Sequence, residues 1–72
     1  MTDQQKVNEA IAQIIEAAGW AAMAEQYRTD DGYRGRILEI MPGYIRRDPK
    51  TAPFADRLDA VIAKARTAGL IL

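Results

Sequence analysis

Apolar residues recur with a helical period in three separate segments of this 72-residue chain. In each segment they fall at i, i+4, i+7, i+8 and i+11, which places them on one side of an α-helix. The three sets are Val7, Ile11, Ile14, Ile15 and Ala18; Tyr33, Ile37, Ile40, Met41 and Tyr44; and Phe54, Leu58, Val61, Ile62 and Ala65. A helix with one apolar side must bury that side against another element. The pattern therefore predicts a single all-α domain over residues 1–72, a small bundle of three or four helices.

Turn and capping residues separate the three segments. Residues 29–32, Thr-Asp-Asp-Gly, are predicted to form a loop whose carboxylates cap the second helix. Pro42 is predicted to end or kink that helix, because a residue before proline avoids helical angles. Residues 46–53 would then form an extended polar connection. Thr51 is the predicted N-cap of the last helix, and Gly69 is its predicted C-terminal cap.

One stretch also fits a different structure. Residues 27–41 contain Gly35, two β-branched isoleucines and the hairpin-type pair Asp31-Gly32, so a short hairpin is an alternative there. The helix is the favoured prediction, because the apolar positions of this stretch do not alternate.

The first helical pattern, residues 3–27, changes its apolar side at Gly19. Trp20, Met23 and Tyr27, spaced i, i+3 and i+7, lie roughly opposite the isoleucines that precede them. A straight helix of this length would measure about 37 Å. A compact domain of this size has a diameter of only about 29 Å.

Two hypotheses account for this change. In the first, the helix breaks or kinks at Gly19 and turns the Trp20 side into the same core. In the second, the helix is continuous and its spare apolar side meets a partner, with Ala17, Ala21 and Ala24 allowing close approach.

The chain lacks the residues on which most enzymes depend. It contains no cysteine, histidine or serine, which removes the common nucleophiles and their usual base. The same absence removes thiolate and imidazole metal ligands. Asp30, Asp31 and Glu39 do not follow the EF-hand spacing, and the glycines match no phosphate-binding fingerprint. We therefore expect no enzymatic activity, no metal and no cofactor.

The distinctive chemical feature is a series of tyrosines that lie beside arginines. Tyrosine, arginine and tryptophan are the residues most enriched at binding hot spots. The candidate partner-binding residues are Trp20, Met23, Tyr27, Tyr33, Arg34, Arg36, Tyr44, Arg46 and Arg47. In the alternative interpretation, the tyrosines fill the rim of the core and the arginines are solvated.

The net charge and the length of the apolar runs limit the classes of function that the chain can have. Ten basic and ten acidic side chains cancel, a balance that does not favour nucleic acid. No apolar run approaches the roughly 20 residues of a membrane span. We expect a cytoplasmic, non-catalytic protein–protein interaction module, a small regulator, inhibitor or adaptor that occupies a partner surface and forms a homodimer. The alternative is a nucleic-acid-binding regulator that uses the basic and aromatic region Arg28–Lys50.

Overall fold

A computed structural model describes residues 2–70 of the chain. The described residues form four α-helices and one short 3-10 turn. These elements are α1 (Asp3–Ala17), α2 (Ala21–Thr29), η1 (Asp31–Tyr33), α3 (Arg34–Arg47) and α4 (Ala52–Thr67). There is no strand within residues 2–70, so the hairpin alternative is wrong. The predicted all-α bundle is confirmed, in its four-helix form.

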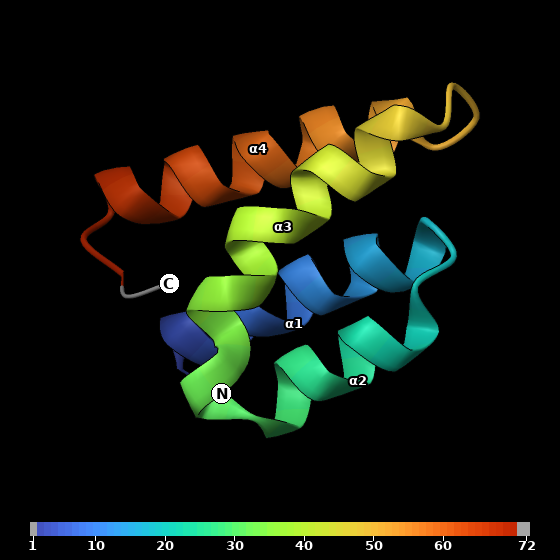
Figure 1. Cartoon of the computed structure of the whole chain (residues 1–72). Helices are drawn as coiled ribbons and strands as arrows, with labels where there is room; N and C mark the ends of the chain where they lie inside the picture. Colours follow the sequence, from blue (N-terminus) through green and yellow to red (C-terminus); the bar gives the residue numbers. More distant parts are fainter. Residues whose placement is uncertain (1, 71–72) are drawn as a thin grey trace.

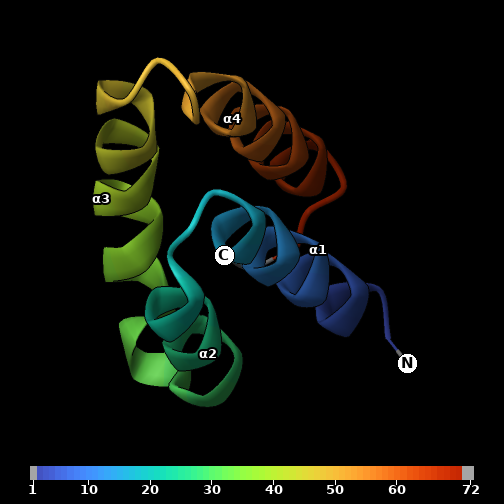
Figure 2. The same cartoon turned by 90° about the vertical axis from the view of Figure 1, so that its right-hand side faces the viewer.

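The four helices enclose one core (Figures 1 and 2). α1 packs against α2 and α4, and α3 packs against α4 in an antiparallel pair joined by a short turn. In the view of Figure 2, α3 and α1 lie on opposite sides of the core, with α4 above and α2 below. The bundle measures 33 × 23 × 19 Å, so a straight helix over residues 3–27 would have overhung it.

Two glycines end helices in the same way. Gly19 follows α1 with a φ of +97°, and Gly69 follows α4 with a φ of +78°. After α1, the N–H of Gly19 donates to the carbonyl of Glu16 at 2.9 Å, and the N–H of Trp20 donates to that of Ile15 at 3.1 Å. This is a Schellman motif, which needs a left-handed residue that glycine supplies without strain. The predicted cap at Gly69 and the break at Gly19 are confirmed, and the continuous first helix is wrong.

The break turns the Trp20 side inward only in part. Tyr27, two turns into α2, is fully buried, and Met23 is half-buried against the core. Trp20 precedes α2 and stays 38% exposed. The side chains that were predicted to share one face therefore divide between the core and the surface.

The apolar sides of all four helices meet in the core. Its largest fully buried side chains are Tyr27, Ile11, Ile15, Ile37, Met41, Ile45 and Leu58. The stripe predicted for α3 is partly wrong, because Tyr33 and Tyr44 are 37% and 41% exposed and Ile45 is buried in their place.

Pro42 lies inside α3 and does not end it. The helix continues to Arg47, which carries Ile45 onto the same inner side as Ile37 and Met41, at i, i+4 and i+8. Burial of a large aliphatic side chain is worth about 1.5–3 kcal/mol, which offsets much of the roughly 3 kcal/mol that an interior proline costs. The predicted connection over residues 46–53 shortens to residues 48–51.

The predicted side-chain caps at α3 and α4 also differ from the structure. Asp30 makes no capping hydrogen bond, and the carboxylate of Asp31 pairs with Arg34 at 2.7 Å instead. Thr51 occupies the N-cap position of α4, but its hydroxyl donates to the carbonyls of Ile45 at 2.7 Å and Asp48 at 3.2 Å. The Thr51 side chain therefore closes the end of α3 and does not cap α4.

Alanine substitutions at two glycines are expected to act in opposite directions. Gly43 lies inside α3 without a positive φ, and a Cβ there would meet nothing within 4 Å. We expect Gly43→Ala to raise the free energy of unfolding by about 0.5–1 kcal/mol, because alanine loses less backbone entropy. Gly19→Ala should lower it by about 1–2 kcal/mol, because its φ is left-handed. Urea titrations of both variants test this, and destabilisation by Gly43→Ala would contradict the helical geometry after Pro42.

Candidate interaction surface

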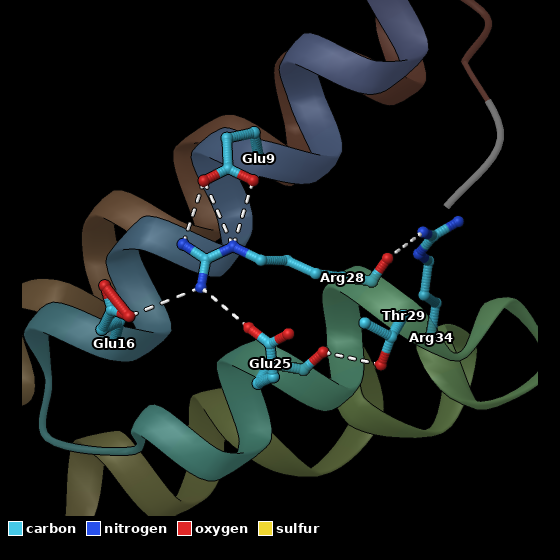
Figure 3. A network of polar contacts seen from close by, with 6 residues as sticks. All are labelled: Glu9, Glu16, Glu25, Arg28, Thr29 and Arg34. Atoms are coloured by element: carbon cyan, nitrogen blue, oxygen red, sulfur yellow. Dashed lines mark hydrogen bonds and ion pairs between the residues drawn. The ribbon is translucent and has the colours of Figure 1, made fainter.

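Arg28 joins α2 to α1 through two carboxylates of α1, Glu9 and Glu16, and it also pairs with Glu25 of α2 (Figure 3). Its Nη2 lies 2.9 Å from Oε1 of Glu9, and its Nε donates to Oε2 of the same carboxylate at 3.1 Å. Its Nη1 lies 3.4 Å from Glu16 and 3.7 Å from Glu25. The hydrogen bond from Arg28 lowers the pKa of Glu9, against a smaller opposing effect of desolvation. Two acidic side chains of α1, Glu9 and Glu16, are thus paired within the molecule.

Arg34 closes the end of α2. Its Nε donates to the carbonyl of Tyr27 at 2.7 Å, and its Nη2 donates to the carbonyl of Arg28 at 3.0 Å. A cation at the carboxyl end of a helix also stabilises the helix dipole. The guanidinium pairs with Asp31 and lies 5.6 Å from the centre of the Tyr27 ring. Arg34, predicted to bind a partner, therefore has an intramolecular role.

Arg46 and Arg36 are also paired with carboxylates. Arg46 lies 3.0 Å from Asp56 and 2.7 Å from Asp59, and so joins α3 to α4. Arg36 is largely exposed and lies 3.4 Å from Glu39, one turn further along α3. The Arg46 contacts raise its pKa, mainly through the hydrogen bond with Asp59. Neither guanidinium is a free charge.

The Tyr27 ring is fully buried, so this candidate partner-binding residue belongs to the core. Its hydroxyl is buried and makes no hydrogen bond within the described part of the chain. Desolvation raises the Tyr27 pKa, and the positive charge of Arg34 offsets part of that effect. A buried hydroxyl without a partner costs about 1–3 kcal/mol.

Replacing Tyr27 with phenylalanine is expected to stabilise the protein by about 1 kcal/mol, because it removes the unpaired hydroxyl and keeps the ring. The pH dependence of the free energy of unfolding should change as well. The raised pKa means that the folded state keeps the Tyr27 proton after the unfolded state has lost it. Wild-type stability is therefore retained at lower pH and falls as the pH rises past about 10. Urea titrations between about pH 9 and 11 should show a shallower fall in Tyr27→Phe, and identical slopes would contradict this role of Tyr27.

Three of the predicted residues form a cluster on the outside of the bundle. The rings of Trp20 and Tyr44 lie 5.6 Å apart between centroids with their planes at 45°. The guanidinium of Arg47 lies 4.7 Å from the centroid of the Tyr44 ring. Arg47 forms no ion pair within residues 2–70. We call Trp20, Tyr44 and Arg47 the Trp20 surface.

Backbone hydrogen bonds fix the position of Trp20 in this surface. Trp20 lies in the joint between α1 and α2, where its N–H donates to Ile15 at 3.1 Å and its carbonyl accepts from Ala24 at 2.9 Å. Tyr44 and Arg47 are one turn apart near the end of α3. The three side chains thus come from two parts of the chain that the fold brings together, which no local pattern in the sequence reveals.

Other candidate sites offer less chemistry. Shallow grooves of about 390 and 530 Å³ between α1 and α4 share Ala10 and Val61 and are lined largely by small apolar side chains. Among residues 2–70, no three acidic side chains converge as a metal site. None of the helices in that range is long and apolar enough to cross a membrane.

Comparisons with protein-family models, with curated proteins and with solved structures find no match to this chain.

Proposed function

We propose that the protein is a non-catalytic protein–protein interaction module, a small regulator, inhibitor or adaptor that occupies the surface of another protein. The observation that carries this proposal is the Trp20 surface. It combines a tryptophan, a tyrosine and an arginine, the three residue types most enriched at binding hot spots. The proposal keeps the cytoplasm as the compartment, as expected from the sequence.

Two partly exposed aromatic rings lie side by side on the surface of this small domain. Trp20 and Tyr44 are 38% and 41% exposed and touch each other, while Tyr27 is fully buried nearby in sequence. Contiguous exposed apolar surface of this kind marks interaction sites in soluble proteins. The two rings each have few rotatable bonds, and the Trp20 backbone is held by hydrogen bonds on both sides. Binding would therefore cost little side-chain ordering.

The nucleic-acid alternative has less support. Four of the six cations in the region Arg28–Lys50 pair with carboxylates of the same chain. A guanidinium that already holds a carboxylate must give up that ion pair to contact a phosphate. Only Arg47 and Lys50 remain without an ion pair in that region of the described chain.

A capture experiment in the native host tests the proposal. Tagged wild-type protein, Tyr44→Ala and the control Arg66→Ala are used as bait, and bound proteins are quantified by mass spectrometry. Arg66 is exposed on α4 and makes no ion pair within residues 2–70, so its removal matches the loss of a surface side chain. We expect a protein partner that is recovered by wild type and Arg66→Ala and is reduced about tenfold or more with Tyr44→Ala.

Salt separates this result from nucleic-acid binding. Phosphate contacts lose affinity steeply between about 50 and 200 mM salt, whereas an aromatic-anchored protein interface does not. The proposal would be overturned if Tyr44→Ala recovered as much of the partner protein as wild type does. It would also be overturned if the partner were lost over this salt range and after nuclease treatment.

A further inference from the structure

Large side chains that no other helix covers fully lie along one side of α3 and at Tyr33, the N-cap residue just before it. Successive members of this set are three, four, four and three residues apart, so they lie on one side of the helix. They extend the Trp20 surface along α3. They are Tyr33, Arg36, Ile40, Tyr44 and Arg47. Tyr33, Arg36, Tyr44 and Arg47 are exposed, and Ile40 is half-buried. We call these five residues the α3 stripe.

The α3 stripe is symmetric about Ile40. Arg36 and Tyr44 lie four residues on either side of Ile40, and Tyr33 and Arg47 lie seven residues on either side. Each tyrosine therefore has an arginine at the same distance beyond Ile40. A twofold axis brings such a surface into contact with itself, because residue i of one copy then faces residue j of the other.

We propose that the occupant of the α3 stripe is a second copy of this chain, with the two α3 helices antiparallel across a twofold axis at Ile40. This inference rests on the proposed function and names the partner of the same surface. In the antiparallel pair, Arg36 faces the partner's Tyr44, and Tyr33 faces the partner's Arg47. Each Arg–Tyr pair occurs twice.

Arginine and tyrosine attract each other when the guanidinium lies over the ring. This contact already exists within the chain, where Arg47 lies 4.7 Å from the centroid of Tyr44. The second copy would extend it into an alternating series of rings and guanidinium groups. Ile40 at the centre would contact its own equivalent and complete a small apolar middle.

Charge favours the antiparallel direction. Asp30 and Asp31 precede α3, and Arg47 lies in its last turn. Antiparallel packing places Asp30 and Asp31, which precede one α3 helix, near the basic last turn of the other and opposes the two helix dipoles. Parallel packing would place Arg47 beside the partner's Arg47. Asp30 and Arg47 form no ion pair within residues 2–70, so both are available for such a contact.

The chain contains no cysteine, so single-cysteine variants report this geometry directly. Two Cα atoms must come within about 7 Å to form a disulfide. Ile40→Cys lies on the proposed axis and should form a disulfide-linked dimer under mild oxidation. Arg47→Cys should not link to itself, because the two copies would lie about 21 Å apart along the helices. Arg66→Cys on α4 measures random collision.

We expect at least tenfold more linked dimer from Ile40→Cys than from Arg66→Cys at the same concentration, and loss of this excess when Tyr44→Ala is added. Mixing Tyr33→Cys with Arg47→Cys should give a mixed dimer. The inference would be overturned if Ile40→Cys formed no more disulfide-linked dimer than Arg66→Cys. Efficient formation of a disulfide between two copies of Arg47→Cys would also overturn it.

The two proposals can fail separately. If capture of a different protein depends on Tyr44 while Ile40→Cys does not link, the inference about a second copy fails and the proposed function stands. If Ile40→Cys links in a Tyr44-dependent way while no other protein is captured, the inference stands and the regulator or adaptor role fails.

Discussion

Replacing Ile45 with alanine is expected to lower the free energy of unfolding by about 2–5 kcal/mol. Ile45 is fully buried, and its removal would leave a cavity between α3 and the rest of the core. A domain of this size is stable by only about 4–11 kcal/mol in total. A urea titration followed by helical circular dichroism should therefore show a large fall in the midpoint.

The neighbouring residue provides the matched control. Tyr44 is 41% exposed, and Tyr44→Ala should change the stability of the monomer by about 1 kcal/mol or less. The comparison is made at a concentration at which the protein does not associate, because association also stabilises the folded state. Equal effects of the two substitutions would mean that α3 does not continue through Pro42 with Ile45 on its inner side.

Replacing Trp20 with alanine is expected to weaken the association of two copies of the chain about 30-fold or more, while the isolated chain stays folded. Hot-spot residues typically lose at least about 2 kcal/mol of binding on truncation, which corresponds to that factor. Trp20 is 38% exposed and contacts Tyr44, so its ring would be covered together with Tyr44 when a second copy packs on the α3 stripe.

Trp20→Phe is the control for this prediction, because it keeps a ring beside Tyr44 and should retain most of the affinity. Sedimentation over a range of concentrations gives the dissociation constants, and circular dichroism gives the helix content. A loss of about 3–5 kcal/mol of stability in Trp20→Ala would instead identify Trp20 as a core residue.

Much of the fold follows from periodicity and glycine. The repeated apolar spacing predicted the helices, and the change of side at Gly19 led to two hypotheses, of which the break is the one that the Schellman motif confirms. The sequence also held a signal that our prediction did not use. Thr2 and Gln5 form a capping box at the start of α1, with hydrogen bonds of 3.1 and 2.9 Å.

The course of α3 could not be predicted from local rules. A proline favours the end of a helix, and that rule was outweighed by the burial of Ile45 beyond it. The decision depends on what α3 packs against, and α4 supplies that contact from a later part of the chain. Local preferences routinely yield to tertiary packing of this kind.

The sequence predicted which types of residue form the candidate site, but it did not predict which individual residues belong to it. The sequence identifies tyrosines beside arginines, but it does not show which arginines find carboxylates. Arg28 reaches Glu9, 19 residues earlier, and Arg46 reaches Asp59, 13 residues later. Such ion pairs depend on how the helices pack. The three residues of the Trp20 surface can therefore be identified only from the folded structure.

If a second copy of this chain covers the Trp20 surface and the α3 stripe, light scattering of the purified protein detects it most directly. At tens of micromolar, wild-type protein should scatter with an average mass approaching twice the 8.0 kDa of the chain, and dilution should return it to the single-chain mass. Tyr44→Ala should remain at the single-chain mass under the same conditions, while Arg66→Ala should behave as wild type. A wild-type mass that stays at 8.0 kDa, or a dimer that Tyr44→Ala leaves intact, would contradict the account.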